Sequence, residues 1–277
     1  MRNPFPRIGK VIKYDLKNSS KKLLPLYGVL LALGLLTGLC ISPTRTEEFF
    51  GGEIMSNNTR DWITISIGFA YYVVACVAAI MTIVVIARRF KQSMLEDEAY
   101  LNLSLPVTMG EHLWGKFITG FIWMFTCCVV TYLSVLFCFI RLGLPDIFRE
   151  LGEALPEMIQ ELHRYNLTIG KIIGMGLLMS FAGTCFLITL IFVVNSFGLV
   201  IKGRQGFWKF LIIVGLLYID GWIFRLVPTF DSRFMTEAAI GNAAMKSFGI
   251  FSLIMIVLSA IYFAVTQFMF TKKLNLD

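Results

Sequence analysis

The sequence predicts an all-α polytopic membrane protein, and three observations predict it. The 277 residues are 57% hydrophobic and only 16% charged, whereas soluble domains are nearer half apolar and a quarter charged. Six apolar runs approach the length of about 20 residues that a helix needs to cross the hydrocarbon of a bilayer. Lys and Arg gather in alternate connecting segments, as they do on the cytoplasmic side of such helices. We therefore expect one domain of six transmembrane helices with both termini in the cytoplasm.

The six expected spans differ in strength. The fourth is longer than a bilayer requires and has to tilt or extend beyond it. The fifth is the weakest, because Lys209, Asp220 and Arg225 leave it only a short uncharged core. In chain order the spans are expected at residues 23–41, 62–87, 117–140, 172–201, 208–227 and 248–270.

The distribution of basic residues sets the orientation. Seven of the 25 Lys and Arg precede the first span, four lie between the second and third, three follow the fourth, and two end the chain, which leaves nine for the other side. Five spans would place Lys272 and Lys273 outside, against the usual rule. The net charge of +7 therefore reflects orientation and attraction to anionic membrane lipid. Nucleic acid is not an expected partner, because the basic residues are divided among loops.

The first 22 residues predict a helix that lies in the cytoplasmic interface. Ile8, Val11, Ile12 and Leu16 recur at helical spacing with lysines between them, which is typical of an amphipathic surface helix. The alternative is a solvated basic tail.

The stretch from Gly110 to Phe117 comes close to a phosphate-binding loop without completing one. Gly110, Gly115 and Lys116 match the G-x-x-x-x-G-K spacing, but Phe117 replaces the Ser or Thr whose hydroxyl binds magnesium. Thr108 and Glu111 instead form the capping-box pattern T-x-x-E ahead of an apolar run. We therefore expect a helix that begins at about Met109 and no nucleotide bound there.

The segment 88–116 between the second and third spans is expected to be a cytoplasmic docking surface. Its acidic cluster is flanked by more apolar residues than an ordinary connector carries, and exposed apolar side chains rimmed by charge are typical of such surfaces. The alternative is a plain solvated loop. The apolar residues are Phe90, Met94, Leu95, Tyr100, Leu101 and Leu103.

This segment resembles the first cytoplasmic loop of ABC-2 type transporter permeases. The shared features are the Arg88–Arg89 exit from the second span, the acidic element Glu96–Asp97–Glu98, the stretch LSLPV, and the entry Gly115–Lys116 into the third span. The opening KYDLKN, residues 13–18, also resembles the family's N-terminal interfacial helix. The resemblance covers about 40 residues in motif and the whole chain in topology.

The resemblance implies a permease without an ATPase of its own. Two permease copies, or two related permease subunits, would pair with two separate nucleotide-binding subunits, which bind ATP and Mg, so that this chain itself carries no cofactor. Residues 91–103 would form the coupling helix. Glu96, Asp97 and Glu98 would face basic groups on the ATPase, Met94, Leu95 and Leu101 would fill its apolar groove, and residues 202–207 would add a smaller contact.

Two outer features accompany the spans. Residues 141–171 hold an amphipathic stripe (Ile147, Phe148, Leu151, Leu155, Met158, Ile159 and Leu162) with acidic residues opposite, and Pro156 suits the start of a second helical piece. We expect an interfacial helix pair that caps the spans; the alternative is a gate or exit element.

Residues 220–234 combine Asp220, Gly221, Arg225 and Pro228, and the family often has short re-entrant helices at this place. Asp220 and Arg225 either pair with each other inside the membrane or lie at its outer interface.

Small residues predict close helix contacts. Gly34 and Gly38 in the first span, and Gly176, Ser180 and Thr184 in the fourth, are spaced four apart, which lets two helices approach. The spacing leaves open whether the neighbour belongs to the same chain or to another copy.

The expected function is export of an amphipathic or apolar substrate, a peptide, lipid-like molecule or drug, across a bacterial plasma membrane. An ion-coupled secondary transporter or channel is the first alternative, although such coupling usually requires ionisable groups inside the spans. An intramembrane protease is the second, but Asp220 has no second carboxylate within a span. An immunity-type exporter would merge with the main expectation. No metal site is expected, since His112 and His163 lie far apart in sequence.

Overall fold

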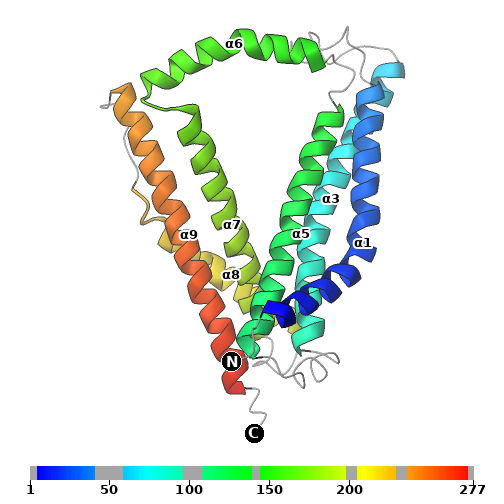
Figure 1. Ribbon diagram of the computed structural model, residues 1–277, viewed down its shortest axis with the longest axis vertical. Helices are drawn as coiled ribbons and strands as arrows, with labels where there is room; N and C mark the ends of the chain where they lie inside the picture. Colours follow the sequence, from blue (N-terminus) through cyan, green and yellow to red (C-terminus); the bar gives the residue numbers. More distant parts are fainter. Residues whose placement is uncertain are drawn as a thin grey trace. The chain divides into compact units, whose positions relative to one another are not determined.

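Every regular element in the described part of the protein is a helix. A computed structural model describes residues 5–40, 59–95, 108–138, 144–197, 205–228 and 236–273, and no strand occurs among them (Figure 1). The helices are α1 (Phe5–Cys40), α3 (Thr59–Leu95), α5 (Met109–Cys138), α6 (Leu144–Arg164), α7 (Ile169–Phe197), α8 (Gln205–Phe224) and α9 (Glu237–Lys273).

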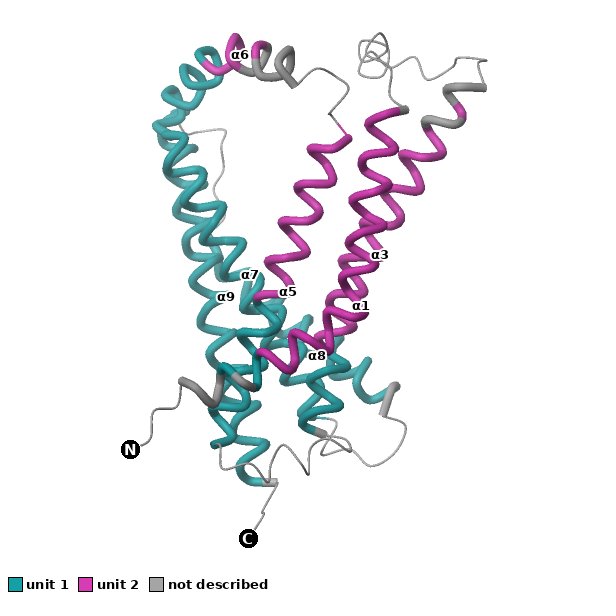
Figure 2. Tube along the Cα trace, turned by 45° about the vertical axis from the view of Figure 1, so that its right-hand side comes forward, with its two compact units in different colours: residues 1–12, 87–121, 156–277 teal, residues 13–86, 122–155 magenta. Residues whose placement is uncertain are grey.

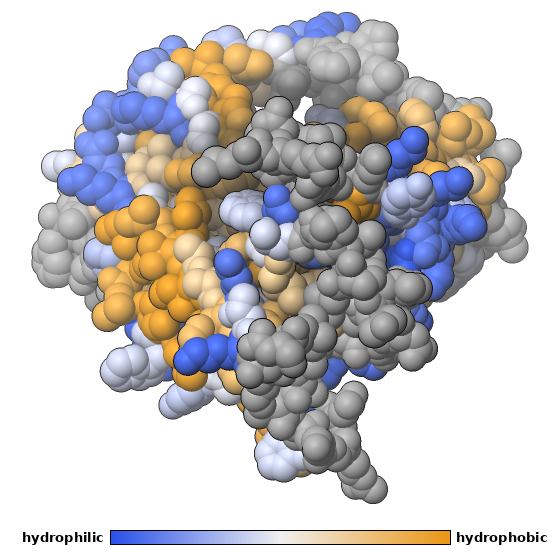
Figure 3. Space-filling model, turned by 60° about the horizontal axis from the view of Figure 1, so that its bottom comes forward, coloured by the Kyte–Doolittle hydropathy of each residue, from blue (hydrophilic) through white to orange (hydrophobic). Residues whose placement is uncertain are grey.

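Six of these helices are long and apolar enough to cross a membrane, and α6 is the exception. The candidate spans are Val11–Leu39, Ile65–Met94, Met109–Cys138, Ile169–Phe197, Phe207–Phe224 and Glu237–Lys272. Their apolar side chains reach the surface in broad patches (Figure 3), which is typical of surfaces that contact lipid or another protein. The chain is therefore a multi-pass membrane protein, and a helix long and apolar enough to cross a membrane lies at each of the six expected positions.

The expected boundary between an interfacial helix and the first span, after residue 22, is absent. Residues 1–22 were expected as a separate interfacial helix, yet α1 runs without a break from Phe5 to Cys40. Its first turns run at an angle to the remainder (Figure 1). Pro25 lies inside the helix and accounts for a bend, because proline removes one helical hydrogen bond and its ring displaces the carbonyl four residues earlier.

Helix α6 also continues through its proline. A second helical piece was expected to begin at Pro156, but the helix is continuous from Leu144 to Arg164. It stops in a Schellman motif: the amide of Leu167 donates to the carbonyl of Leu162 at 2.8 Å, and that of Asn166 donates to His163 at 3.0 Å. Asn166 takes the left-handed conformation, φ 54°, that this stop requires.

The described chain divides into two compact units (Figure 2). The first comprises residues 1–12, 87–121 and 156–277, and the second comprises residues 13–86 and 122–155. In the second unit the hydroxyl of Tyr27 donates to that of Thr82 at 2.8 Å, since Thr82 itself donates to the carbonyl of Ala78. Such bonds satisfy polar groups where no water is available.

Candidate functional site

The start of α5 is a capped helix. The amide of Thr108 donates to Oε2 of Glu111 at 2.8 Å, and the amide of Glu111 donates to Oγ1 of Thr108 at 3.4 Å. This reciprocal pair is the expected capping box. Gly110 and Gly115 lie within α5, and Lys116 is buried, so the G-x-x-x-x-G-K stretch forms helical turns and not a loop.

The last turns of α3 are packed into the core of the first unit. The ring of Phe90 stacks on that of Phe192 in α7, with centroids 4.2 Å apart, and meets the edge of Phe270 in α9 at 5.9 Å. Phe90 and Met94 are each only 1% exposed. This burial contradicts the expectation that Met94 lies on a docking surface, because its side chain is already covered by the chain itself.

The rest of the expected coupling element is not placed by the structure. The side chain of Leu95 and all of Glu96, Asp97, Glu98 and Leu101 lie outside the described residues. The structure shows that α3, which leads into these residues, is anchored in the core and continues to Leu95. The sequence had predicted a loop from residue 88.

Asp220 is buried against α9. The hydroxyl of Tyr262 donates to Oδ1 of Asp220 at 2.5 Å, while Oδ2 has no hydrogen-bond partner among the described residues. Asp220 is 1% exposed, whereas Arg225 is exposed and forms no ion pair with it. Of the two alternatives for these residues, the pairing is wrong, because α8 ends at Phe224 and Arg225 lies beyond it. The alternative that they lie at the outer interface stays a prediction.

The expected re-entrant element remains undescribed in part. Residues 225–227 form a turn after α8, and residues 229–235 lie outside the described residues. The fifth span therefore ends three residues earlier than expected.

A second polar bond holds the other end of α8. Nζ of Lys209 donates to Oδ1 of Asn195 in α7 at 3.1 Å, and Nδ2 of Asn195 donates to the carbonyl of Ile191 at 2.9 Å. The charge of Lys209 was expected to weaken the fifth span. The structure shows that its ammonium group meets a polar acceptor in the neighbouring helix.

Aromatic rings join α7, α8 and α9 near Asp220. Phe186 of α7 lies 6.0 Å from Tyr262 and 6.1 Å from Phe224 of α8, measured between ring centroids, and Phe224 lies 4.6 Å from Phe251 of α9. Sequence reasoning missed Tyr262. The available signal was a tyrosine in the last span with a buried carboxyl group in the span before it.

The small residues of the first span form a close contact within the chain. A Cβ atom added to Gly34 would lie 2.6 Å from the backbone oxygen of Ser134, and one added to Gly38 would overlap the backbone oxygen of Phe137. Ser134 also accepts a hydrogen bond from Tyr71 at 2.9 Å. The expected close approach is therefore confirmed for α1 and α5.

The matching residues of the fourth span make no such contact. A Cβ atom at Gly176 would meet nothing within 4 Å, and Ser180 is exposed. Within the described part of the chain, the same spacing of small residues accompanies a close helix contact in α1 but not in α7.

A metal or cofactor site does not emerge from the geometry. Among the described residues, no group of three or more His, Cys, Asp and Glu side chains is arranged to hold a metal ion. His112 is buried near the start of α5 and His163 is exposed at the end of α6.

Comparison of the chain with protein-family models, with curated proteins and with solved structures found no match.

Proposed function

We propose that this chain is the permease subunit of an ATP-driven exporter of the ABC-2 type. It works with two copies of a separate nucleotide-binding subunit and with a second permease copy or a related permease. Six candidate spans support a transport role. The observation that carries the proposal is the packing of Phe90 between α7 and α9, directly ahead of residues 96–103. Motion of that segment is transmitted through α3 to two further spans.

The partner contact follows from the same segment. Glu96, Asp97 and Glu98 meet basic groups of the ATPase, and Leu95 and Leu101 enter its apolar groove, while Met94 holds α3 in place from inside. ATP and Mg are bound by that partner and not by this chain. The substrate is amphipathic or apolar, consistent with the apolar surfaces of the spans, and moves outward across a bacterial plasma membrane with both chain ends in the cytoplasm.

Copurification with candidate ATPases tests the proposal. Replacement of Glu96, Asp97 and Glu98 by Ala is expected to abolish association with the ATPase and ATP-driven transport. The matched control removes three acidic residues elsewhere, by replacing Glu153, Glu157 and Glu161 of α6 with Ala, and keeps both. Association that survives the first triple change, or transport that needs no ATP, contradicts the proposal.

Ion-coupled transport is a second candidate, and one observation favours it. Asp220 places a carboxyl group in a span with one oxygen that no described residue binds, and such groups often serve ion coupling. In reconstituted vesicles this function requires uptake driven by a proton or sodium gradient without an ATPase, and its loss in Asp220→Asn. Gradient-independent, ATP-dependent transport by Asp220→Asn rules it out.

A further inference from the structure

Helix α6 has one apolar side. At about 100° per residue, the apolar positions 155, 158, 159 and 162 fall in an arc of about 100°. The helical register extends this arc to Ile147, Phe148 and Leu151. The opposite side carries two ion pairs, Arg149 with Glu153 at 3.9 Å and Arg164 with Glu161 at 3.1 Å, together with the exposed Glu157. The helix is therefore strongly amphipathic.

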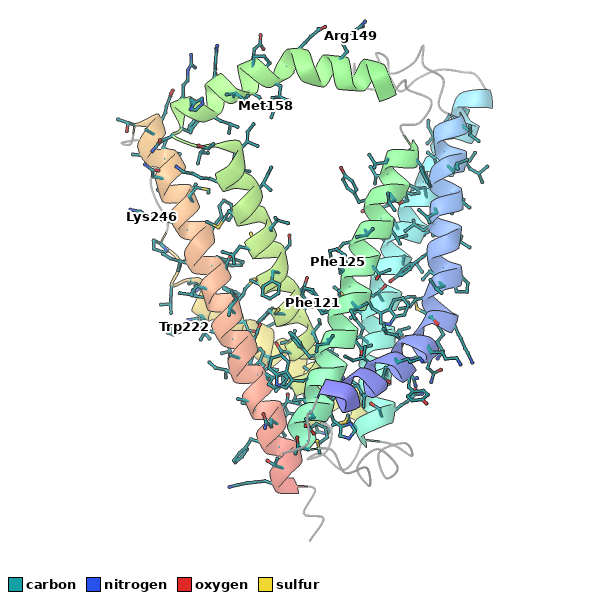
Figure 4. The ribbon with its side chains drawn as sticks, in the orientation of Figure 1. Phe121, Phe125, Arg149, Met158, Trp222 and Lys246 are labelled. Carbon is teal, nitrogen blue, oxygen red and sulfur yellow. The ribbon has the colours of Figure 1, made fainter. Side chains whose placement is uncertain are left out.

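The apolar side is only partly covered by the part of the chain that the structure describes, since Ile159 and Leu162 are half-buried while Leu155 and Met158 are exposed. Leu155 is 36% exposed and Met158 is 52% exposed. Figure 4 shows Met158 on the side of α6 from which α7 and α9 of the same unit extend, and Arg149 on the opposite side of the ribbon.

Short connections keep α6 near the bilayer. Five residues separate it from α5 and four separate it from α7, so neither link exceeds about 20 Å when fully extended. The second link is fixed further: Nδ2 of Asn166 donates to Oδ1 of Asn242 in α9 at 3.3 Å. The backbone of Tyr165 also lies close to Gly241 of α9. A Cβ atom added to Gly241 would overlap the backbone oxygen of Tyr165.

We propose that α6 lies flat in the headgroup region, with Leu155 and Met158 against the acyl chains of zwitterionic phospholipid. The bilayer that surrounds α5 and α7 is continuous with this site, and an amphipathic helix gains free energy by burying its apolar side there. The helix carries five acidic and two basic residues besides His163. Anionic lipid therefore does not strengthen the contact.

Depth-dependent quenching tests this in the full-length protein. Single cysteines at Met158 and at Gln160, on opposite sides of α6, are introduced after the native cysteines are replaced by Ala, labelled with an NBD fluorophore, and reconstituted in phosphatidylcholine vesicles. Nitroxide lipids labelled on the upper part of the acyl chain are expected to quench position 158 about three-fold more than position 160. Anionic phosphatidylglycerol is expected to give no increase.

Equal quenching at the two positions overturns the proposal, as does water protection at position 158 without quenching, which would indicate a protein partner. A second measurement needs no substitution. Phosphatidylcholine with a diazirine in its acyl chain is photolysed around the wild-type protein. Adducts are expected on Leu155 or Met158 and not on Glu157. Labelled spans with an unlabelled α6 contradict the proposal.

Discussion

At the scale of single residues, Asp220 shows how a carboxyl group is accommodated inside an apolar helix. Removing one partner from a buried polar pair leaves the other unsatisfied, which costs about 1–3 kcal/mol, whereas replacing both by apolar groups is much less harmful. Tyr262 is the partner that the structure provides. The pair is therefore expected to behave as a unit in mutagenesis.

Tyr262→Phe is expected to lower the free energy of unfolding by about 1–3 kcal/mol, because Asp220 loses its donor. The double variant Asp220→Leu, Tyr262→Phe is expected to recover part of this loss. Tyr218→Phe is the control, since Tyr218 is 76% exposed on the same helix α8. Thermal unfolding in detergent measures all three, and a double variant that is no more stable than Tyr262→Phe refutes the coupling.

The glycines of α1 give a second residue-scale prediction. Gly34→Val is expected to cost about 1–3 kcal/mol, because the new side chain overlaps the backbone at Ser134. Gly176→Val, where nothing lies within 4 Å, is expected to leave the melting temperature unchanged. Equal destabilisation would mean that helix propensity, and not contact, sets the loss.

At the scale of elements, the first turn of α5 depends on its cap. Thr108→Ala is expected to destabilise the protein by about 1 kcal/mol and to speed amide exchange at residues 109–112. Thr126→Ala, within the same helix, is the control, because its hydroxyl bonds only the carbonyl of Ile122. Unchanged exchange in Thr108→Ala would show that packing alone holds the turn.

Helix α8 is held differently from its neighbours. Only 6% of the span Phe207–Phe224 is buried, and polar bonds secure the helix near both ends, to Asn195 and to Tyr262. A helix with so little covered surface relies on those bonds for its position in the fold.

At the scale of the whole molecule, the link from residues 96–103 to the spans is expected to pass through Phe90. Phe90→Leu keeps the site apolar but removes the stacked ring, so ATPase association is expected to persist while ATP-driven transport falls. Phe125→Leu serves as the control, because Phe125 is 63% exposed on α5. Full transport by Phe90→Leu excludes this route of coupling.

The sequence predicted what depends on local chemistry. Span positions follow from runs of apolar residues, the α5 start from Thr108 and Glu111, and the α1 contact from Gly34 and Gly38. It did not predict the continuity of α1 and α6 through Pro25 and Pro156, since a proline in a helix bends or ends it according to its surroundings. The burial of Met94 and the partner of Asp220 depend on which helices become neighbours, and no local spacing records that.

The bond between Asp220 and Tyr262 also has a consequence for biosynthesis. Translation completes α8 before α9 exists, so Asp220 meets the membrane without its donor. A charged Asp costs up to about 3 kcal/mol on insertion when it lies at the centre of a span, and Asp220 lies four residues before the end of α8, the shortest candidate span. We therefore expect integration of α8 to be more stable once α9 is present, so that a nascent chain halted before residue 236 holds its fifth span less firmly in the hydrocarbon.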